Sequence, residues 1–369
     1  MNPVYITGTG VWTPSDTITN EELVESFNAY AELFNKQHAA EIAAGKLEPM
    51  SGSSVEFIEK ASGIKQRFVM EKSGVLDPER MYPSFPQRSD DELSLMAEIG
   101  VKAAKQALEA AGREASEIDL VICASSNHQR PYPAIAVEIQ FALGCTGYGY
   151  DMNVACSSAT FGIEQAANAI RSGQAKRALV LGPEITSGHL EWRDRDCHFI
   201  FGDVSTAVLL ESEPSGAQKQ AWEILGSKAA TQFSNNIRNN AGFLNRCEPQ
   251  GQEGRDKLFR QEGRKVFKEV CPMAADHIAG HLRDNGFHPQ QVRRFWLHQA
   301  NLGMNQLIAK KLLERDATLD EAPVILDRYA NTASAGSIIA FHEHSADLAP
   351  GNVGVICSFG AGYSIGSHV

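Results

Sequence analysis

The sequence lacks the features that mark secreted, membrane and zinc-ribbon proteins. Its seven cysteines are an odd number and form no Cys-x-x-Cys pair, which argues against a disulfide framework and a zinc ribbon. No apolar run reaches the ~20 residues that span a bilayer, and the amino terminus shows no basic segment followed by a long apolar core. We therefore expect a cytoplasmic protein with no membrane segment.

Positive charge is also scarce. The 34 lysines and arginines are outnumbered by 45 aspartates and glutamates, which gives a net charge of −11. Because such a chain repels phosphate backbones on average, nucleic acid is not an expected partner, although a local basic patch could still receive an acidic one. What the chain does have is 369 residues with 43% hydrophobic content, enough for a large core and about two domain-sized units.

The two halves of the chain repeat one order of elements. The first half predicts an alanine-rich helix that ends at Gly112 and a strand at 120–124, and the second predicts a helix from about Met273 to Gly286 and a strand at 295–297. The glycines that end the two helices are separated by 286 − 112 = 174 residues. Two more pairs follow in the same order: residues 153–157 with 331–335 at 331 − 153 = 178, and strands 177–181 with 352–356 at 352 − 177 = 175. This order predicts a duplicated α/β chain.

The duplication sets the expected domains. We expect mixed or parallel sheets with helix layers on their faces, and a boundary in the polar stretch with proline and glycine at 211–219. The predicted halves are residues 1–214 and 215–369. Segments near 27–54 and 72–91 fit the duplication poorly and are predicted insertions, either solvated decoration or loops that set substrate preference.

Cys156 is a candidate nucleophile. It ends a strand-like stretch and precedes a helical pattern that stops at Gly173. The apolar positions that share one face of this helix are Ala159, Ile163, Ala166, Ala167 and Ile170. The helix N-terminus is expected to favour a thiolate and to lower the thiol pKa below ~8.5. The alternative, still open at this point, is a buried cysteine that acts as a small hydrophobe.

Three further motifs narrow the functional interpretation of the chain. They are Leu297-His298-Gln299-Ala300-Asn301, Tyr329-Ala330-Asn331-Thr332-Ala333-Ser334 and the terminal Ser358-Phe359-Gly360-Ala361-Gly362-Tyr363. Together with Cys156 they resemble, in order and spacing, β-ketoacyl-acyl-carrier-protein synthase III of the thiolase superfamily, over nearly the whole chain apart from the insertions. The resemblance implies a thiolase-like αβαβα fold in which Cys156 of the first half meets His298 and Asn331 of the second.

The resemblance also implies a reaction. Cys156 would take the acyl group of an acyl-CoA primer, while His298 and Asn331 would donate hydrogen bonds to the carbonyl of malonyl-acyl carrier protein as it loses CO₂. Backbone N–H groups of Cys156 and Ala361 would form the oxyanion hole. The product would be a 3-oxoacyl-acyl carrier protein of fatty acid synthesis. No metal and no cofactor are expected, because the coenzyme A thioester is itself a substrate.

Substrate contacts are carried over from the same resemblance. Phe57 and Arg195 would hold the adenine of coenzyme A between an aromatic face and a guanidinium plane, and Phe267 and Asn301 would line the site. Tyr132 would reach across a homodimer to floor the partner's acyl pocket. The longer insertion makes the chain more similar to relatives that accept medium-chain acyl-CoA.

The basic segment 261–268 and Lys310-Lys311 would dock the acidic carrier protein. The chain departs from the family pattern at three of these contact positions. Phe57 stands where the family often has tryptophan, Ala61 where it often has arginine, and Gly303 where a docking arginine is typical. At Ala61 and Gly303 the chain therefore lacks the arginines that the family often has in this segment and on its docking surface.

The sequence offers only weak support for other classes of protein. A metal-dependent hydrolase at His342 and His344 has only a His-x-His pair, and a dinucleotide fold at Gly8-Thr9-Gly10 lacks the third glycine. A non-enzymatic partner subunit conflicts with the intact nucleophile. Among condensing enzymes, a polyketide-starting acyltransferase or a hydroxymethylglutaryl-CoA synthase stays open, although the latter needs a carboxylate base that the sequence does not place. Thiolysis is disfavoured because Ser358 occupies the second-cysteine position of thiolases.

Overall fold

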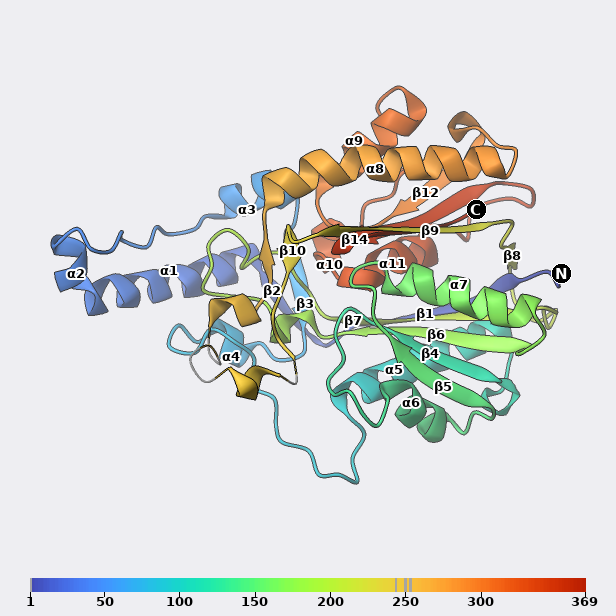
Figure 1. Ribbon diagram of the computed structural model, residues 1–369, viewed down its shortest axis with the longest axis horizontal. Helices are drawn as coiled ribbons and strands as arrows, with labels where there is room; N and C mark the ends of the chain where they lie inside the picture. Colours follow the sequence, from blue (N-terminus) through green and yellow to red (C-terminus); the bar gives the residue numbers. More distant parts are fainter. Residues whose placement is uncertain (1, 243, 249–250, 252–253) are drawn as a thin grey trace.

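Two β-sheets, each built mainly from one half of the chain, organise the computed structural model, which describes residues 2–242, 244–248, 251 and 254–369 (Figure 1). In spatial order the first sheet contains β5 (Tyr148–Met152), β4 (Leu120–Ala124), β6 (Arg177–Glu184), β7 (Val204–Glu211), β1 (Tyr5–Trp12) and β8 (Trp222–Glu223). The second contains β12 (Arg294–Leu297), β13 (Gly354–Gly360), β14 (Gly362–His368) and β9 (Ser227–Ser234).

Strand directions repeat between the two sheets. β4 runs parallel to β6, which is antiparallel to β7, which is antiparallel to β1. β12 likewise runs parallel to β13, which is antiparallel to β14, which is antiparallel to β9. The predicted duplication of strand order is therefore present. β8, which follows the predicted boundary at residue 214, pairs with β1 of the first sheet.

Helices form three layers around the sheets. α5 (Leu95–Ala111) and α6 (Ile135–Leu143) cover the outer face of the first sheet. α7 (Ser158–Arg171) and α11 (Gly336–Glu343) lie between the sheets and contact strands of both. α8 (Gly263–Asp284) packs on β13 and β14, with α9 (Leu302–Leu313) beside it. This αβαβα order confirms the fold class (Figure 1).

Apolar residues fill each interface between layers. The cluster between the sheets combines α7 residues such as Ile163 with α11 residues such as Ile338, and separate clusters lie under α5 and under α8. The middle layer therefore ties the two halves together, and both α7 and α11 start at the loops that carry the candidate site residues.

One helix boundary differs from the prediction. α8 begins at Gly263 rather than near Met273 and contains Pro272 in its interior. Proline lacks an N–H and normally disfavours a helix interior. Here Val266 and Val270 on the N-terminal part are buried, so the apolar face continues through the proline and its burial outweighs the missing hydrogen bond.

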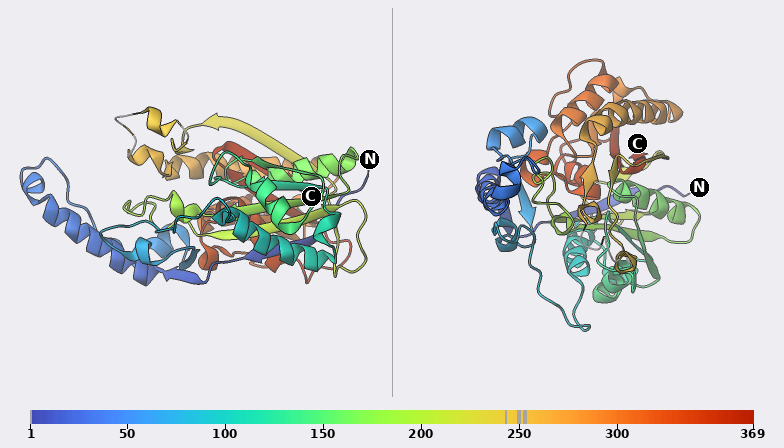
Figure 2. Two further views of the ribbon diagram at one scale, coloured as in Figure 1. Left: turned by 90° about the horizontal axis from the view of Figure 1, so that it is seen from below. Right: turned by 60° about the vertical axis from the view of Figure 1, so that its left-hand side comes forward.

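The predicted insertion near 27–54 forms an arm. α1 (Asn20–Gln37) and α2 (Ala39–Ala43) project away from the layered body in two views (Figures 1 and 2). The returning segment is fixed to α1 by paired hydrogen bonds of the Asn35 side chain to Met50 and of the Asn28 side chain to Ser53. At the base, the Phe27 ring packs on His198 with 4.4 Å between ring centroids.

The remaining elements are short. They are β2 (Asp16–Thr19), α3 (Val55–Ser62), β3 (Gln66–Val69), α4 (Ser73–Leu76), β10 (Ile237–Arg238), β11 (Arg260–Gln261), α10 (Leu326–Tyr329) and the 3-10 helices at Ala115–Glu117, Thr186–Gly188, Asn245–Cys247, Arg255–Lys257, Pro289–Gln291 and Ala333–Ala335. Across the described part of the chain, none of the helices has both the length and the apolarity that crossing a bilayer would require.

Candidate active site

Cys156 lies on a tight loop between β5 and α7. The Ala155 N–H donates to Asn153 Oδ1 (2.9 Å), and Ala155 has φ +47°, a left-handed conformation that is uncommon for alanine. The terminal glycine turn presses against this loop: a Cβ at Gly360 would lie 2.6 Å from the Cys156 Cβ. Only glycine allows this approach, so the turn and the thiol are held against each other.

Asn331 lies on the equivalent loop of the second half. The Ala333 N–H donates to Asn331 Oδ1 (2.9 Å), and Ala333 has φ +49°. Both loops therefore contain an asparagine that accepts from the residue two positions on, and a left-handed alanine, at the predicted offset of 178. Because Oδ1 is occupied, the Nδ2 of Asn331 is the atom available to a ligand.

The sequence-predicted side chains meet in one cavity. Cys156, His298 and Asn331 line a cavity of about 880 Å³ together with Phe359 and Gly360. The structure thus brings a thiol from the first half close to an imidazole and a carboxamide from the second.

His298 is held as a neutral ring. It follows β12, its backbone N–H donates to the Cys357 carbonyl (2.8 Å), and its side chain is 2% exposed. The Phe359 ring stands edge-to-face at 5.1 Å. Burial lowers the pKa of His298 to about 4, so at neutral pH the ring is uncharged and can donate one hydrogen bond from one nitrogen.

The predicted lowering of the Cys156 pKa is wrong. Burial raises the pKa of this thiol to about 12, and the nearby Glu184 carboxylate adds to the rise. The backbone N–H groups of Cys156 and Ala361 favour the thiolate but do not offset these effects. Cys156 is half-buried and lines the cavity, and α7 starts only at Ser158. Desolvation of the thiol is the largest cause of the raised pKa.

This difference can be measured by alkylation. We expect the rate constant for iodoacetamide reaction at Cys156 to rise about tenfold per pH unit from pH 7 to pH 9 without levelling off, because the thiolate fraction keeps growing below the thiol pKa. Peptide mass mapping reports the rate, with the exposed Cys247 as an internal reference for the reagent. A plateau below pH 8 would show that the helix N-terminus dominates after all.

Tyr363 holds the glycine-rich turn at residues 360–362 in place. Tyr363 follows Gly362 and is 2% exposed. Its hydroxyl donates to Glu269 Oε2 on α8 (2.7 Å) and accepts from Asn236 Nδ2 (2.8 Å). These contacts fix the chain that presents the Ala361 N–H toward Cys156.

Three of the predicted substrate contacts lie at the same cavity. Phe57 and Phe267 line it, as does Asn301. The Asn301 side chain is occupied structurally: Oδ1 caps α9 by accepting from Gly303 N (2.9 Å), and Nδ2 donates to the Ala61 carbonyl (2.6 Å).

Arg195 lies directly on the Phe57 face. Its guanidinium carbon is 3.9 Å from the ring centroid, and its Nε donates to the Gly52 carbonyl (2.6 Å). A base cannot lie between the two side chains as they stand, so adenine would have to displace the guanidinium from the ring.

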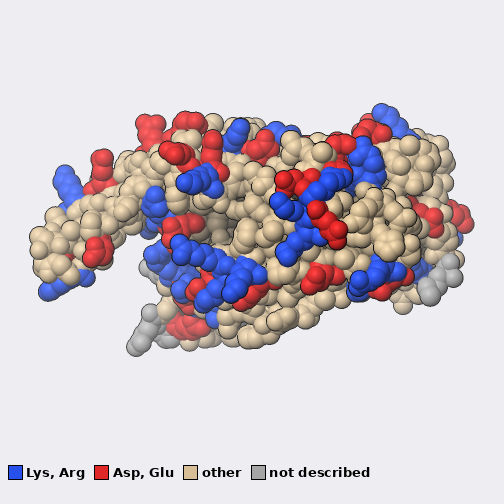
Figure 3. All heavy atoms as spheres, turned by 90° about the horizontal axis from the view of Figure 1, so that it is seen from above, with Lys and Arg blue, Asp and Glu red and all other residues tan. Residues whose placement is uncertain are grey.

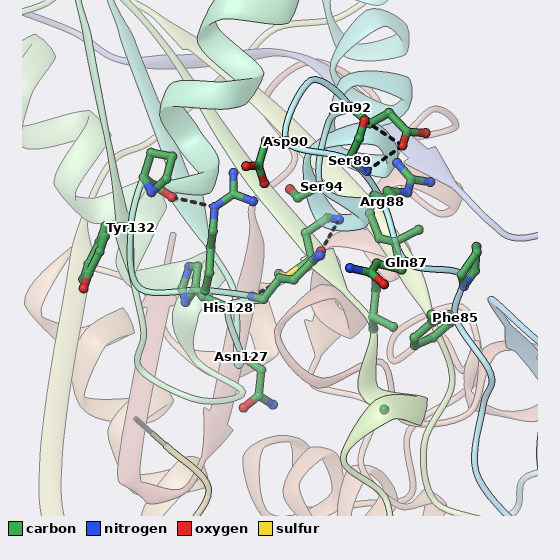
Figure 4. Close-up of a pocket in the computed structure, with 18 of the residues that line it drawn as sticks. Phe85, Gln87, Arg88, Ser89, Asp90, Glu92, Ser94, Asn127, His128 and Tyr132 are labelled. Atoms are coloured by element: carbon green, nitrogen blue, oxygen red, sulfur yellow. Dashed lines mark hydrogen bonds between the residues drawn. The ribbon is translucent and has the colours of Figure 1, made fainter. Parts of the chain in front are cut away.

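Tyr132 lies at a different cavity. It is 81% exposed and lines a space of about 790 Å³ opposite Phe85, with residues of the predicted 72–91 insertion between them (Figure 4). The structure therefore does not bring Tyr132 to the Cys156 cavity within one chain.

The predicted docking residues are on the surface. Arg264, Lys265 and Lys268 of α8 and the Lys310-Lys311 pair of α9 are exposed. Figure 3, which views this side of the molecule, shows lysines and arginines gathered in clusters with acidic residues between them. Lys310 pairs with Asp316 (2.9 Å).

The rival readings find no support in the described residues. Gly8 and Gly10 lie inside antiparallel β1 rather than at a strand-to-helix turn. In the part of the chain with described positions, the one group of three potential metal ligands whose ligand atoms lie within 4.8 Å of one another is Cys123, His128 and Asp151, and it contains neither His342 nor His344. Both Asp151 oxygens accept backbone N–H groups at the start of α6 (2.8 Å each).

Sequence reasoning missed Glu184 and Cys197. Cys197 lines the Cys156 cavity, and Glu184 ends β6 with 1% exposure. A signal for Glu184 was present, because it is an acidic residue at the end of an otherwise apolar buried strand, where an isolated charge is unfavourable unless it has partners.

Known proteins resemble the chain over its whole length. The family model described as 3-oxoacyl-[acyl-carrier-protein] synthase III matches residues 150–232, and the corresponding C-terminal model matches residues 282–369. A beta-ketodecanoyl-[acyl-carrier-protein] synthase of Pseudomonas aeruginosa is 61% identical over 94% of this chain and 99% of its own. A beta-ketoacyl-[acyl-carrier-protein] synthase III of Granulibacter bethesdensis is 27% identical over 100% and 99%.

Solved structures agree in fold. The 3-oxoacyl-[acyl-carrier-protein] synthase III of Aquifex aeolicus superposes with a TM-score of 0.76 at 24% identity, covering 99% of this chain and 98% of that one. The priming β-ketosynthase of the R1128 polyketide pathway gives a TM-score of 0.75 at 21% identity over 99% and 94%.

Proposed function

The chain belongs to the 3-oxoacyl-[acyl-carrier-protein] synthase III family, the condensing acyltransferases of fatty acid synthesis, and from this premise we propose that it joins a medium-chain acyl-CoA to malonyl-acyl carrier protein through an acyl-Cys156 intermediate. The observation that carries the proposal is the convergence of Cys156, His298 and Asn331 on one cavity.

The first step transfers the acyl group to Cys156. The sulfur attacks the thioester carbonyl, the bond from carbonyl carbon to coenzyme A sulfur breaks, and the thiol proton ends on the departing coenzyme A sulfur. The N–H groups of Cys156 and Ala361, which favour negative charge at this position, hold the tetrahedral oxyanion. No cofactor is needed, because the thioester supplies the leaving group.

The second step is decarboxylation of the malonyl group. When CO₂ leaves, the electron pair of the broken carbon–carbon bond moves onto the thioester oxygen. The neutral His298 ring and the Asn331 Nδ2 donate to that oxygen and stabilise the enolate, on the scale of ~3 kcal/mol per donor. The carbanion then attacks acyl-Cys156, the carbon–sulfur bond breaks, and the released thiolate regains a proton from solvent.

The proposed chain length of the acyl primer comes from the name of the Pseudomonas aeruginosa relative. A beta-ketodecanoyl product has ten carbons, of which two come from malonyl, so the primer of that 61% identical protein has eight. We propose the same length here. Each additional buried methylene contributes up to ~0.8 kcal/mol, which favours octanoyl-CoA strongly over acetyl-CoA in a long pocket.

A panel of primers tests this function. Acetyl-, butyryl-, octanoyl- and dodecanoyl-CoA are each incubated with the protein, and intact mass spectrometry reports the adduct and its rate. We expect octanoyl-CoA to acylate Cys156 at least about a hundredfold faster than acetyl-CoA, and malonyl-acyl carrier protein then to discharge the adduct as a ten-carbon product. A preference for acetyl-CoA would refute the primer assignment, and the absence of every adduct would refute the function.

The carrier protein and coenzyme A would reach the cavity from the same side. We assign the adenine to the Phe57 face after displacement of Arg195, and the acidic carrier to the exposed lysines and arginine of α8 and to Lys310-Lys311. Charge complementarity of this kind mainly raises the association rate.

A second copy of the chain would complete the acyl pocket. Exposed apolar side chains gather around α6 and β5, the edge strand of the first sheet: Tyr132 (81%), Phe141 (85%), Tyr148 (45%) and Val137 (44%). An apolar edge of this kind is typical of an interface. In the homodimer Tyr132 would floor the partner's pocket, as the family resemblance implies.

Sedimentation velocity tests the dimer. We expect the wild-type protein to sediment as a dimer and Phe141→Glu as a monomer, because the variant places a charge in the apolar interface. Leu319→Glu, at a residue that is also exposed (72%) but lies beside α9, is the matched control and should remain dimeric. Equal behaviour of the two variants would contradict the assigned interface.

A further inference from the structure

Glu184 is a buried carboxylate at the end of β6. It is 1% exposed, and no lysine, arginine or histidine of the described residues forms an ion pair with it. Burial raises its pKa to about 7, while donors from Ser126 and Ser334 oppose the rise. A carboxylate in such a place persists only when hydrogen bonds satisfy its oxygens.

Its partners come from both halves of the chain. Oε1 accepts from the Ser126 N–H (2.9 Å) and the Ser334 N–H (3.3 Å), and the Ser334 hydroxyl donates to the same oxygen. Oε2 accepts from the Ser126 hydroxyl (2.5 Å). One side chain thus bridges the loop after β4 and the loop that carries Asn331.

Ser126 connects Glu184 to the nucleophile. The Ser126 carbonyl accepts from Asn153 Nδ2 (2.8 Å). The other end of that amide, Oδ1, accepts the N–H of Ala155, the left-handed residue before Cys156. Glu184, Ser126 and Asn153 therefore form a continuous chain of contacts that ends at the thiol loop.

Ser334 connects Glu184 to Asn331. It follows the left-handed Ala333, whose N–H fixes Asn331 Oδ1. Its offset from Cys156, 334 − 156 = 178, equals the offset between the two asparagines, so Ser334 occupies the repeat position of the nucleophile. Left-handed non-glycine residues persist only where their surroundings hold them. Glu184 contacts Ser126, whose carbonyl holds the Asn153 amide, and Ser334, which directly follows Ala333.

We propose that Glu184 is a positioning residue that sets the distance between the acylated sulfur and the malonyl carbonyl by bridging the Cys156 loop and the Asn331 loop. This inference rests on the proposed condensation. Because a misplacement of ~1 Å can cost about a hundredfold in rate, loss of the bridge should impair the joining of the two substrates more than either partial reaction.

Three rates distinguish this role from simple structural support: acylation of Cys156 by octanoyl-CoA, decarboxylation of malonyl-acyl carrier protein, and overall condensation. In Glu184→Ala we expect the condensation kcat to fall about a hundredfold, each partial reaction to fall less, and the KM for malonyl-acyl carrier protein to change little. Glu184→Gln keeps an acceptor oxygen and should recover most of the rate.

Substitution of one serine at a time tests separately the contact of Glu184 with the Cys156 side, through Ser126, and with the Asn331 side, through Ser334. Ser334→Ala should slow decarboxylation and spare acylation, and Ser126→Ala should do the reverse. Glu211→Gln is the matched control, because Glu211 is also fully buried but lies at the opposite end of the sheet, paired with Arg113 and Arg177. It should lower the melting temperature without changing the ratio of the three rates.

The outcomes are distinguishable. If the wild-type protein shows neither partial reaction, the proposed function fails. If it shows both, and Ser126→Ala and Ser334→Ala leave all three rates unchanged, the bridge is wrong and the function stands. Equal losses in all three rates for every variant, matching the control, would show that Glu184 gives structural support only. If Glu184→Ala does not fold, the two serine variants still distinguish a positioning role from structural support.

Discussion

Cys156→Ala is expected to form no acyl adduct with octanoyl-CoA and to lose condensation by at least about a thousandfold. Alanine removes the sulfur that would form the covalent bond, and the remaining groups of the cavity could then only orient substrates. The change is small and leaves the contact with Gly360 intact, so folding should be preserved. Intact mass spectrometry and product formation from malonyl-acyl carrier protein report the two effects.

Cys197→Ala is the matched control. Cys197 lines the same cavity and is 6% exposed, so it is the other thiol that an acyl-CoA in this cavity could meet. Burial raises its pKa, and neighbouring acidic groups add to the rise. We expect Cys197→Ala to acylate and condense like the wild type. An adduct that persists in Cys156→Ala and disappears in Cys197→Ala would exchange the roles of the two cysteines.

The duplication and the site loops could be predicted because they depend on local sequence. The end of α5 at Gly112 and the strand at 120–124 follow from apolar periodicity and glycine stop positions, and the structure reproduces both. In the second half, α8 ends at Asp284 rather than Gly286, and the strand predicted at 352–356 is β13 at Gly354–Gly360. The repeat also indicated that residues 153–157 and 331–335 are equivalent, which the matching side-chain hydrogen bonds of Asn153 and Asn331 confirm.

Features that depend on tertiary surroundings were not predictable. The pKa of Cys156 depends on how much protein encloses the thiol and on Glu184, a residue 28 positions away (184 − 156). The start of α8 depends on the burial of Val266 and Val270 on both sides of the usual stop signal at Pro272. Neither quantity is encoded in the residues immediately around these positions.

The same limit applies to substrate contacts. The family resemblance implied Phe57 and Arg195 as a pair, and the structure places them in contact, but only coordinates reveal that the guanidinium already covers the ring. Tyr132 lies outside the Cys156 cavity of its own chain, and the proposed role in a partner's pocket cannot be placed by the fold of one copy.

His298→Ala and Asn331→Ala are expected to retain acylation of Cys156 and to lose decarboxylation of malonyl-acyl carrier protein by about a hundredfold to a thousandfold each. Removal of one preorganised donor to a developing oxyanion has effects of this size. In the proposed mechanism neither side chain is required for attack on the acyl-CoA, since the N–H groups of Cys156 and Ala361 would hold that oxyanion.

The two donors should act as a unit on one oxygen. In the double variant the loss of decarboxylation should therefore be smaller than the product of the two single losses, because residues that act together are not additive. His281→Asn is the matched control: His281 is also buried and its pKa is also lowered to about 4 by burial, but it lies on α8 against Ser367. It should leave both partial reactions unchanged, and equal losses of acylation and decarboxylation in the His298 and Asn331 variants would contradict the division of roles between the two halves.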